Sequence, residues 1–336
     1  MMVAAAAGQQ RPYVNRFHQR SGASMSAASH FADRLGEAVC RRGNPVLVGL
    51  DPRWDCLPLS FRQRHGTPSH MEIAAAYRAF CEGVIDVVAP LVPCVKPQAA
   101  FFEDSGPEGM RALAYVIAYA RQRGLLVILD GKRNDIGSTA AAYASAYLGA
   151  DSPWGADALT VSPYLGDDSL SPFVSVAQER GAGVFVLVKT SNPGGGLFQD
   201  LDVGGLTLYR RVAAFVEQLA GSTLGTCGYG AVGAVAGATY PAQLSELRAA
   251  MPHTWFLVPG VGAQGATARD VAGAFDPAGL GAVVNSSRGI IFAHSRKEFK
   301  DRFSDRDWQR AVEAATHQLI EELRGETPAG RLHAAS

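Results

Sequence analysis

The chain has 336 residues, of which 47% are apolar and 18% are charged, so it has ample material for a buried core. Its formal net charge is zero. A neutral chain lacks the basic excess on which non-specific binding to nucleic acid or to a membrane surface depends, so neither partner is expected. No apolar run reaches the ~18 residues that a membrane span needs.

The first 32 residues contain no Asp or Glu and hold several Arg and Ser. Organellar transit peptides share this composition, and so do disordered extensions and stretches upstream of a later start such as Met25. We interpret residues 1–30 as a disordered extension, residues 31–325 as a single domain, and residues 326–336 as a disordered tail.

Between these ends, short β-branched apolar runs alternate with longer Ala-rich helical patterns. The runs are apolar throughout, as parallel strands buried on both faces are. We expect strands at 46–51, 94–98, 126–132, 158–162, 184–190, 231–237, 255–260 and 282–287. We expect helices at 71–88, 108–123, 138–148, 168–179, 206–220, 241–250, 267–274 and 308–323.

Eight such strand–helix units predict an α/β fold, a TIM (β/α)8 barrel in one domain. An open, doubly wound sheet is the alternative, and the lack of a G-x-G-x-x-G motif after the first strand counts against it. The long connection at 191–205 has no role that the sequence indicates.

The five cysteines are odd in number and form no C-x-x-C pair. This pattern predicts reduced thiols in a cytoplasmic protein, rather than disulfides or a zinc site.

Charged residues follow three of the predicted strands, at the barrel end where active sites of this fold lie. Asp51 ends the first strand and Lys96 lies in the second. Asp130 and Lys132 lie at the end of the third strand, and Asp135 comes shortly after it. Asp130 and Lys132 are two residues apart on a strand and should face the same side. Charges in such a place must be paired or functional. They predict a network that keeps a lysine protonated and oriented, as a proton donor requires.

Two other interpretations of these charged residues remain open. They could form a salt bridge at the barrel rim, or the carboxylates could form a Mg²⁺ site. The interleaved lysines already neutralise the carboxylates, so we expect no metal.

The ends of the last two predicted strands indicate a phosphate site. Gly260, Gly262 and Gly265 would let backbone N–H groups approach an anion, and Arg288 could add a charge-assisted contact. TIM barrels commonly bind phosphate at these two loops. Turn glycines beside a surface arginine are the alternative.

Taken together, these segments resemble the orotidine 5′-monophosphate decarboxylase family, in particular its longer bacterial branch. The resemblance spans about residues 40 to 295. Its most specific element is Asp130-Gly-Lys132-Arg-Asn-Asp135-Ile136, which fits the family's D-x-K-x-x-D-I signature. Position 137 is Gly, where many relatives have Pro. The other matching segments, in the expected order, are Gly49-Leu50-Asp51, Val95-Lys96-Pro97, Thr190-Ser191-Asn192-Pro193-Gly194, Pro259-Gly-Val-Gly-Ala-Gln264-Gly and the Arg288 turn.

The resemblance implies decarboxylation of orotidine 5′-monophosphate to UMP without a cofactor. Lys132 would protonate C6 of the pyrimidine as CO2 leaves. Asp130 would lie against the substrate carboxylate, Lys96 would hold the charge network and contact the ribose, and Asp51 would bind the ribose hydroxyls.

The resemblance also implies a homodimer, in which Asp135 and Thr139 reach into the neighbouring subunit's site. Ser191 and Gln264 would bind the amide edge of the pyrimidine. Gln264 and Arg288 would hold the phosphate, beside the two glycines of the seventh-strand loop.

Two other functions remain as alternatives. A Mg²⁺-dependent decarboxylase or aldolase acting on a keto-sugar phosphate shares the barrel and the D-x-K-x-x-D motif, but is expected to carry an acid where this chain has Lys96. A non-catalytic barrel that binds a phosphate ligand would need the third-strand charges to be structural only.

Overall fold

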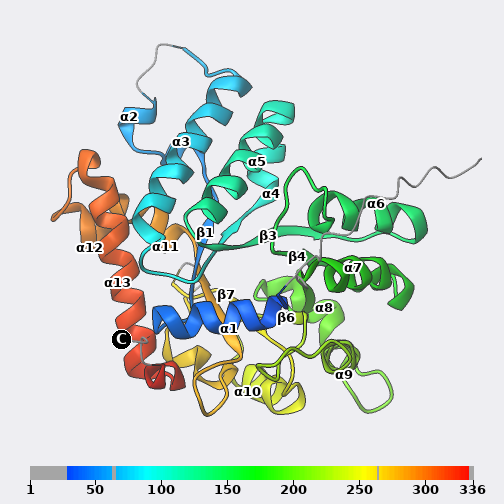
Figure 1. Ribbon diagram of the computed structural model, residues 1–336. Coiled ribbons are helices and arrows are strands. Elements are labelled where there is room, and N and C mark those ends of the chain that lie inside the picture. The colour runs from blue at the N-terminus through cyan, green and yellow to red at the C-terminus, as the bar shows by residue number, and fades with distance from the viewer. Residues whose placement is uncertain (1–28, 63–65, 263–264, 333–336) are drawn as a thin grey trace, which may run out of the picture.

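The structure is a computed structural model and describes residues 29–62, 66–262 and 265–332. Eight parallel strands form a closed barrel in chain order, with helices around it (Figure 1), so the predicted TIM barrel is confirmed. Each strand overlaps one of the predicted ones. The strands are β1 (Val46–Leu50), β2 (Cys94–Pro97), β3 (Leu126–Arg133), β4 (Ala158–Val161), β5 (Gly183–Lys189), β6 (Val232–Ala236), β7 (Phe256–Pro259) and β8 (Ala282–Ser286).

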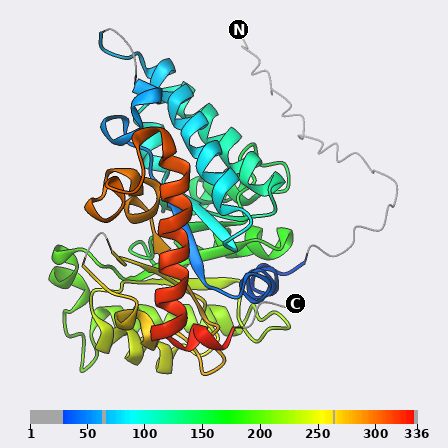
Figure 2. The same cartoon turned by 90° about the vertical axis from the view of Figure 1, so that its left-hand side faces the viewer.

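The helices cover the outside of the strands, and α13 runs along the side of the molecule that faces the viewer in Figure 2. The α-helices are α1 (Phe31–Arg42), α2 (Leu59–Arg62), α3 (His70–Val88), α4 (Ala99–Glu103), α5 (Gly106–Gln122), α6 (Gly137–Leu148), α7 (Asp167–Arg180), α8 (Gly196–Gln199), α9 (Leu208–Gly221), α10 (Pro241–Ala250), α11 (Arg288–Ile291), α12 (Lys297–Lys300) and α13 (Trp308–Glu326). Short 3-10 helices are η1 (Trp54–Cys56), η2 (Pro193–Gly195), η3 (Arg269–Ala274), η4 (Ala293–Ser295), η5 (Asp305–Asp307) and η6 (Pro328–Arg331).

The strands are buried because each has apolar side chains on both faces, one toward the barrel interior and one toward the helices. Paired residues on neighbouring parallel strands point to the same side. Gly49 pairs with Lys96, and Leu47 pairs with both Cys94 and Asn285. This register brings the polar ends of β1, β2 and β8 to one mouth of the barrel.

Helix α1, which was not among the predicted helices, closes the opposite end. His30, at its N-cap, is 2.8 Å from the backbone oxygen of Thr223, in the segment that joins α9 to β6. Arg34 donates to the buried carboxylate of Asp157, just before β4, at 2.7 Å. These contacts join α1 to the amino ends of the strands, so the mouth that carries the site is the other one.

Two predictions differ from the structure. The helix predicted at 267–274 is the 3-10 helix η3, which covers Arg269–Ala274. The tail predicted to be disordered from residue 326 is folded up to Leu332, because η6 buries Ala329 and Leu332 against the core. Most of the extension predicted at 1–30, namely residues 1–28, lies outside the described residues. No helix in the described part of the chain is long and apolar enough to cross a membrane.

Candidate active site

The predicted contact among the charges of β2 and β3 is present, and Asp130 is at its centre. One carboxylate oxygen, Oδ2, accepts from Lys96 Nζ at 2.8 Å and from Gln98 Nε2 at 3.0 Å. The other, Oδ1, accepts from Lys132 Nζ at 2.6 Å and from the hydroxyl of Thr160 at 3.0 Å. Four side-chain donors therefore fix both oxygens of one carboxylate.

The charges of this cluster keep one another ionised. Burial alone would raise the pKa of Asp130, but the charges and hydrogen bonds of Lys96 and Lys132 outweigh it and hold that pKa far below its usual range. Burial alone would lower the pKa of Lys96, but the charges of Asp130 and Asp51 outweigh it and raise that pKa. The Lys96–Asp130 ion pair is thus kept across the physiological pH range.

Lys132 has an unusual backbone. Its φ of 44° is left-handed, which occurs at no other non-glycine residue in the described ranges. The pairing of β3 with β4 shifts register between Leu129 and Arg133, and the Lys132 N–H donates to Thr160 Oγ1 at 2.9 Å. Lys132 and Asp130 therefore meet through a bulge, and not through the regular alternation that the sequence predicted. Such strain persists where the surroundings hold it and is concentrated at functional sites.

The two lysines differ in exposure. The Lys96 side chain is 4% exposed, whereas that of Lys132 is 47% exposed. A ligand in the barrel mouth can therefore reach the Lys132 ammonium, while Lys96 lies behind it. Asp51, just after β1, has a buried Oδ1 without a hydrogen-bond partner in the described structure.

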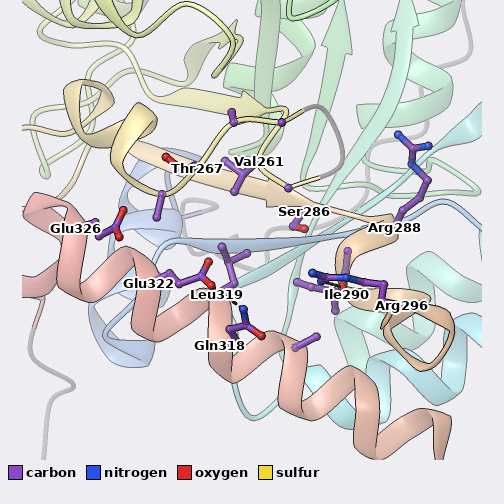
Figure 3. Close-up of a pocket in the computed structure, with 16 residues that line it drawn as sticks. Val261, Thr267, Ser286, Arg288, Ile290, Arg296, Gln318, Leu319, Glu322 and Glu326 are labelled. Atoms are coloured by element: carbon purple, nitrogen blue, oxygen red, sulfur yellow. Dashed lines mark hydrogen bonds between the residues drawn. The ribbon is translucent and has the colours of Figure 1, made fainter. Parts of the chain in front are cut away.

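The predicted phosphate residues Gly262, Gly265 and Arg288 line one cavity of about 680 Å³. In Figure 3 the Arg288 side chain points away from α13, whose residues form the opposite wall. Gly262 and Gly265 have φ values of 78° and 88°, which glycine adopts without strain. Gln264, predicted to bind both base and phosphate, lies outside the described residues.

The structure does not bring Asp135 and Thr139 into the Asp130 cluster of the same chain. Asp135 accepts from the backbone N–H of Ile136 at 2.8 Å, and Thr139 is exposed in the first turn of α6.

Ser191 is held in the loop that follows β5. Its carbonyl accepts from the hydroxyl of Thr239 at 3.1 Å, and a Cβ at Gly237 would come within 2.9 Å of the Ser191 Cβ. The buried Lys189 forms an ion pair with Asp200 and so ties the far part of the loop to the end of β5.

Sequence reasoning missed two residues of the cluster, Gln98 and Thr160. Thr160 is the one polar residue of the buried strand β4. A single polar residue in an otherwise apolar strand could have identified it as a candidate site residue. Across the described ranges no three His, Cys, Asp or Glu side chains come together as a metal site would require.

A closed βα barrel with a Lys–Asp–Lys cluster at its carboxyl-terminal mouth, and with a glycine-lined cavity between the loops after β7 and β8 and helix α13, is built as a TIM-barrel enzyme that acts on a phosphorylated small molecule. Residues 44–301 match the family described as orotidine 5′-phosphate decarboxylase / HUMPS family. The chain belongs to this family.

Individual relatives agree with the family assignment. The chain is 60% identical over 299 residues to orotidine 5′-phosphate decarboxylase of Rhodopirellula baltica, covering 88% of this chain and 99% of that one. It is 45% identical over 264 residues to the enzyme of the same name from Deinococcus radiodurans, covering 78% and 89%. The solved structure of Leishmania donovani OMP decarboxylase has a TM-score of 0.68 and 35% identity, covering 88% of this chain and 98% of that one.

Proposed function

We propose that Lys132 is the proton donor in the decarboxylation of orotidine 5′-monophosphate to UMP and CO2, the reaction of pyrimidine nucleotide synthesis that this chain catalyses. One observation carries this assignment: a half-exposed ammonium at the barrel mouth is locked 2.6 Å from the buried carboxylate of Asp130. Loss of CO2 leaves an electron pair at C6 of the pyrimidine. A cation fixed beforehand stabilises that charge without reorganising and then delivers its proton there.

The other site residues have separate roles in this proposal. Asp130 orients Lys132 and lies where the substrate carboxylate enters. Its negative charge therefore destabilises the bound substrate but not the product, which has lost that carboxylate. Lys96 balances Asp130 from behind. Asp51 binds the ribose, and Ser191 binds the pyrimidine amide.

The phosphate is held by Arg288 with the backbone of Gly262 and Gly265, and Gln264 contributes to both phosphate and base. Binding energy from this remote group can be used to orient the ring over Lys132. No cofactor takes part.

The first experiment is to follow the loss of orotidine 5′-monophosphate absorbance in excess EDTA, with UMP as the measured product. The wild-type protein should turn over, Lys132→Ala should lose turnover by several orders of magnitude while still binding UMP, and Lys297→Ala, an exposed lysine on α12, should match the wild type. A Lys132→Ala protein with near-normal turnover would refute the assignment.

The same assay separates the alternatives. Activity on a keto-sugar phosphate that EDTA abolishes would support a Mg²⁺-dependent decarboxylase or aldolase. Lys96 counts against that alternative, because its ammonium pairs with Asp130 where a metal-binding acid would be needed. Nucleotide binding without turnover would support a binding barrel.

We further propose that the enzyme is a cytoplasmic homodimer in which Asp135 and Thr139 complete the partner's site. Large apolar side chains are exposed after three successive strands: Ile136 at 54%, Tyr164 at 79% and Leu197 at 70%. Apolar side chains gathered in this way are typical of an interface. Asp135 and Thr139 flank Ile136, so a partner that covers these loops would receive both residues.

Complementation tests this dimer. A Lys132→Ala chain and an Asp135→Ala chain, each inactive alone, are unfolded together and refolded as a mixture. Random pairing makes half of the dimers mixed, and each mixed dimer has one intact site, so about a quarter of wild-type activity should return. A mixture without recovered activity, although mixed dimers form, would show that Asp135 acts within its own chain.

A further inference from the structure

The peptide group between Gly131 and Lys132 is held at both of its polar atoms. Its N–H donates to Thr160 Oγ1 at 2.9 Å. Its carbonyl accepts from Arg133 Nη1 at 2.7 Å. A peptide group is planar, and its C=O and N–H point in opposite directions, so the two bonds together fix its orientation. The φ of 44° at Lys132 is the rotation that directly follows this fixed group.

Arg133 is also the residue at which the pairing of β3 with β4 resumes after the bulge. β3 advances four positions over residues 129–133, where β4 advances two over residues 159–161. The extra length is taken up around Lys132. A lysine keeps a left-handed backbone only where its surroundings hold it there, and Arg133 supplies one of the two bonds that do so.

The Arg133 side chain reaches the carbonyl by folding back over Gly131. A Cβ at Gly131 would touch Arg133 Cγ at 3.6 Å and Cζ at 3.8 Å, and would come within 3.1 Å of Leu159 Cδ1. The space beside Gly131 is therefore filled by these two neighbouring side chains, and the guanidinium lies directly against the backbone that it holds.

The guanidinium is anchored on its other side by two helices. Nη2 donates to the carboxylate of Glu103, at the end of α4, and to the hydroxyl of Tyr147, on α6; the distance to the hydroxyl is 3.1 Å. The ring centroids of Tyr143 and Tyr147 lie 5.8 and 5.2 Å from Cζ. The Arg133 side chain is only 18% exposed. The planar fork of arginine can make all of these contacts at once, so the donor that meets the Gly131 carbonyl is fixed in place.

These contacts are linked to the reacting group. Thr160, which accepts from the Lys132 N–H, donates to Asp130 Oδ1 at 3.0 Å. The same carboxylate oxygen accepts from Lys132 Nζ at 2.6 Å. A rotation of the peptide group would break the bond to Thr160 and would carry the Lys132 ammonium away from this carboxylate.

We propose that Arg133 is a positioning residue for the decarboxylation. It holds the Gly131 carbonyl from the helix side of β3 and so keeps the Lys132 ammonium where C6 is protonated. The inference rests on the proposed role of Lys132 as the proton donor. Arg133 acts without touching the substrate, because its guanidinium is enclosed by α4 and α6.

The test compares the wild type, Arg133→Met and Tyr147→Phe in kcat for orotidine 5′-monophosphate, in UMP affinity by calorimetry, and in melting temperature. Arg133→Met keeps an unbranched stem and removes every donor, whereas Tyr147→Phe removes one anchor and keeps the ring. Arg180→Met is the matched control. Arg180 also donates to two backbone carbonyls, those of Ala156 at 2.6 Å and Gly155 at 3.1 Å, but at the end of the barrel away from the site.

Arg133→Met should lower kcat roughly 10- to 100-fold, because a displacement of about 1 Å can cost an enzyme about 100-fold in rate. Its UMP affinity should stay near the wild-type value. Tyr147→Phe should lower kcat roughly 3- to 10-fold, the value of one hydrogen bond, and it provides the test if Arg133→Met does not fold. Arg180→Met should lower the melting temperature and leave kcat unchanged. A crystal structure of Arg133→Met should show Lys132 outside the left-handed region.

A wild-type kcat in the variants that fold would overturn the inference. So would a fall in kcat matched by an equal fall in UMP affinity, because the whole site would then be distorted. A slow Arg133→Met enzyme that keeps Lys132 left-handed and in contact with Asp130 would overturn it as well. Failure of the proposed function is distinguishable, since Lys132→Ala would then turn over near-normally. An inactive Lys132→Ala beside a fully active Arg133→Met would remove only the role of Arg133.

Discussion

Asp130→Asn should destabilise the empty protein more than any single surface substitution, because it leaves the Lys96 ammonium buried without its ion-pair partner. The Lys96 side chain is 4% exposed and its Nζ lies 2.8 Å from Asp130 Oδ2. Removing one partner of such a pair costs about 3–5 kcal/mol. With an unfolding entropy of about 2.1 cal/mol/K per residue, this corresponds to a drop of about 5–8 °C in melting temperature for a folded region of roughly 300 residues.

The loss of stability that Asp130→Asn causes should depend on pH in a defined direction. In the wild type the lowered pKa of Asp130 contributes stability that is present above the carboxyl's unfolded pKa and is lost as pH falls through the folded value. The raised pKa of Lys96 contributes stability that is present below the unfolded lysine pKa and is lost as pH rises through the folded value. The gap between wild type and Asp130→Asn should therefore be widest near neutral pH and narrow at both extremes.

Thermal unfolding followed by circular dichroism between pH 2 and 12 measures this gap, because the two contributions are lost below the unfolded carboxyl pKa and above the unfolded lysine pKa. Asp86→Asn is the matched control, since Asp86 forms an exposed ion pair with Arg123 at 2.7 Å and should cost at most about 1 kcal/mol. The double variant Lys96→Met with Asp130→Asn should be more stable than Asp130→Asn alone, because the buried charge is gone. Equal melting temperatures for wild type and Asp130→Asn at pH 7, or a gap that is the same at every pH, would refute the reasoning.

Three further outcomes are expected. Arg288→Ala should weaken UMP binding roughly 10- to 100-fold and uridine binding hardly at all, because the lost contact is a charge-assisted one to phosphate; equal effects on both ligands in calorimetry would remove Arg288 from the phosphate site. Asp200→Ala should have a lower melting temperature than Lys189→Met, although both variants break the same ion pair. Asp200→Ala leaves the buried Lys189 charged without a counter-ion, whereas Lys189→Met leaves Asp200, which can be hydrated. The reverse order of melting temperatures would contradict this. Gly183→Ala should cost about 1–3 kcal/mol in chemical denaturation, because a Cβ there would lie 2.2 Å from the Phe31 ring; an unchanged denaturation midpoint would show that the ring can move away.

The barrel could be predicted because each strand has a recognisable local sequence pattern. Runs such as β1 and β6 are apolar at every position, and no solvent-facing alternation obscures them. Once the strands are placed, the fold itself gathers their carboxyl ends, so Lys96, Asp130 and Lys132 could be expected to meet before any contact was known.

What the sequence could not show depends on long-range contact and on backbone detail. Helix α1 lies before the first strand and finds its partners before β4 and β6, so no neighbouring segment indicated it. The left-handed conformation of Lys132 arises from a register shift between β3 and β4, which a single strand does not encode. The position of Asp135 relative to the cluster depends on a second chain in our proposal, and one chain's sequence does not place it.

The closure of the barrel has a consequence for how the chain is made. β1 is paired on one side with β2 and on the other with β8, which is synthesised about 230 residues later. Until β8 leaves the ribosome, β1 presents an open edge to other chains, and such edges promote aggregation. Closing the ring is therefore a late, non-local step, and the nascent protein is most vulnerable just before β8 and the phosphate-site arginine that follows it emerge.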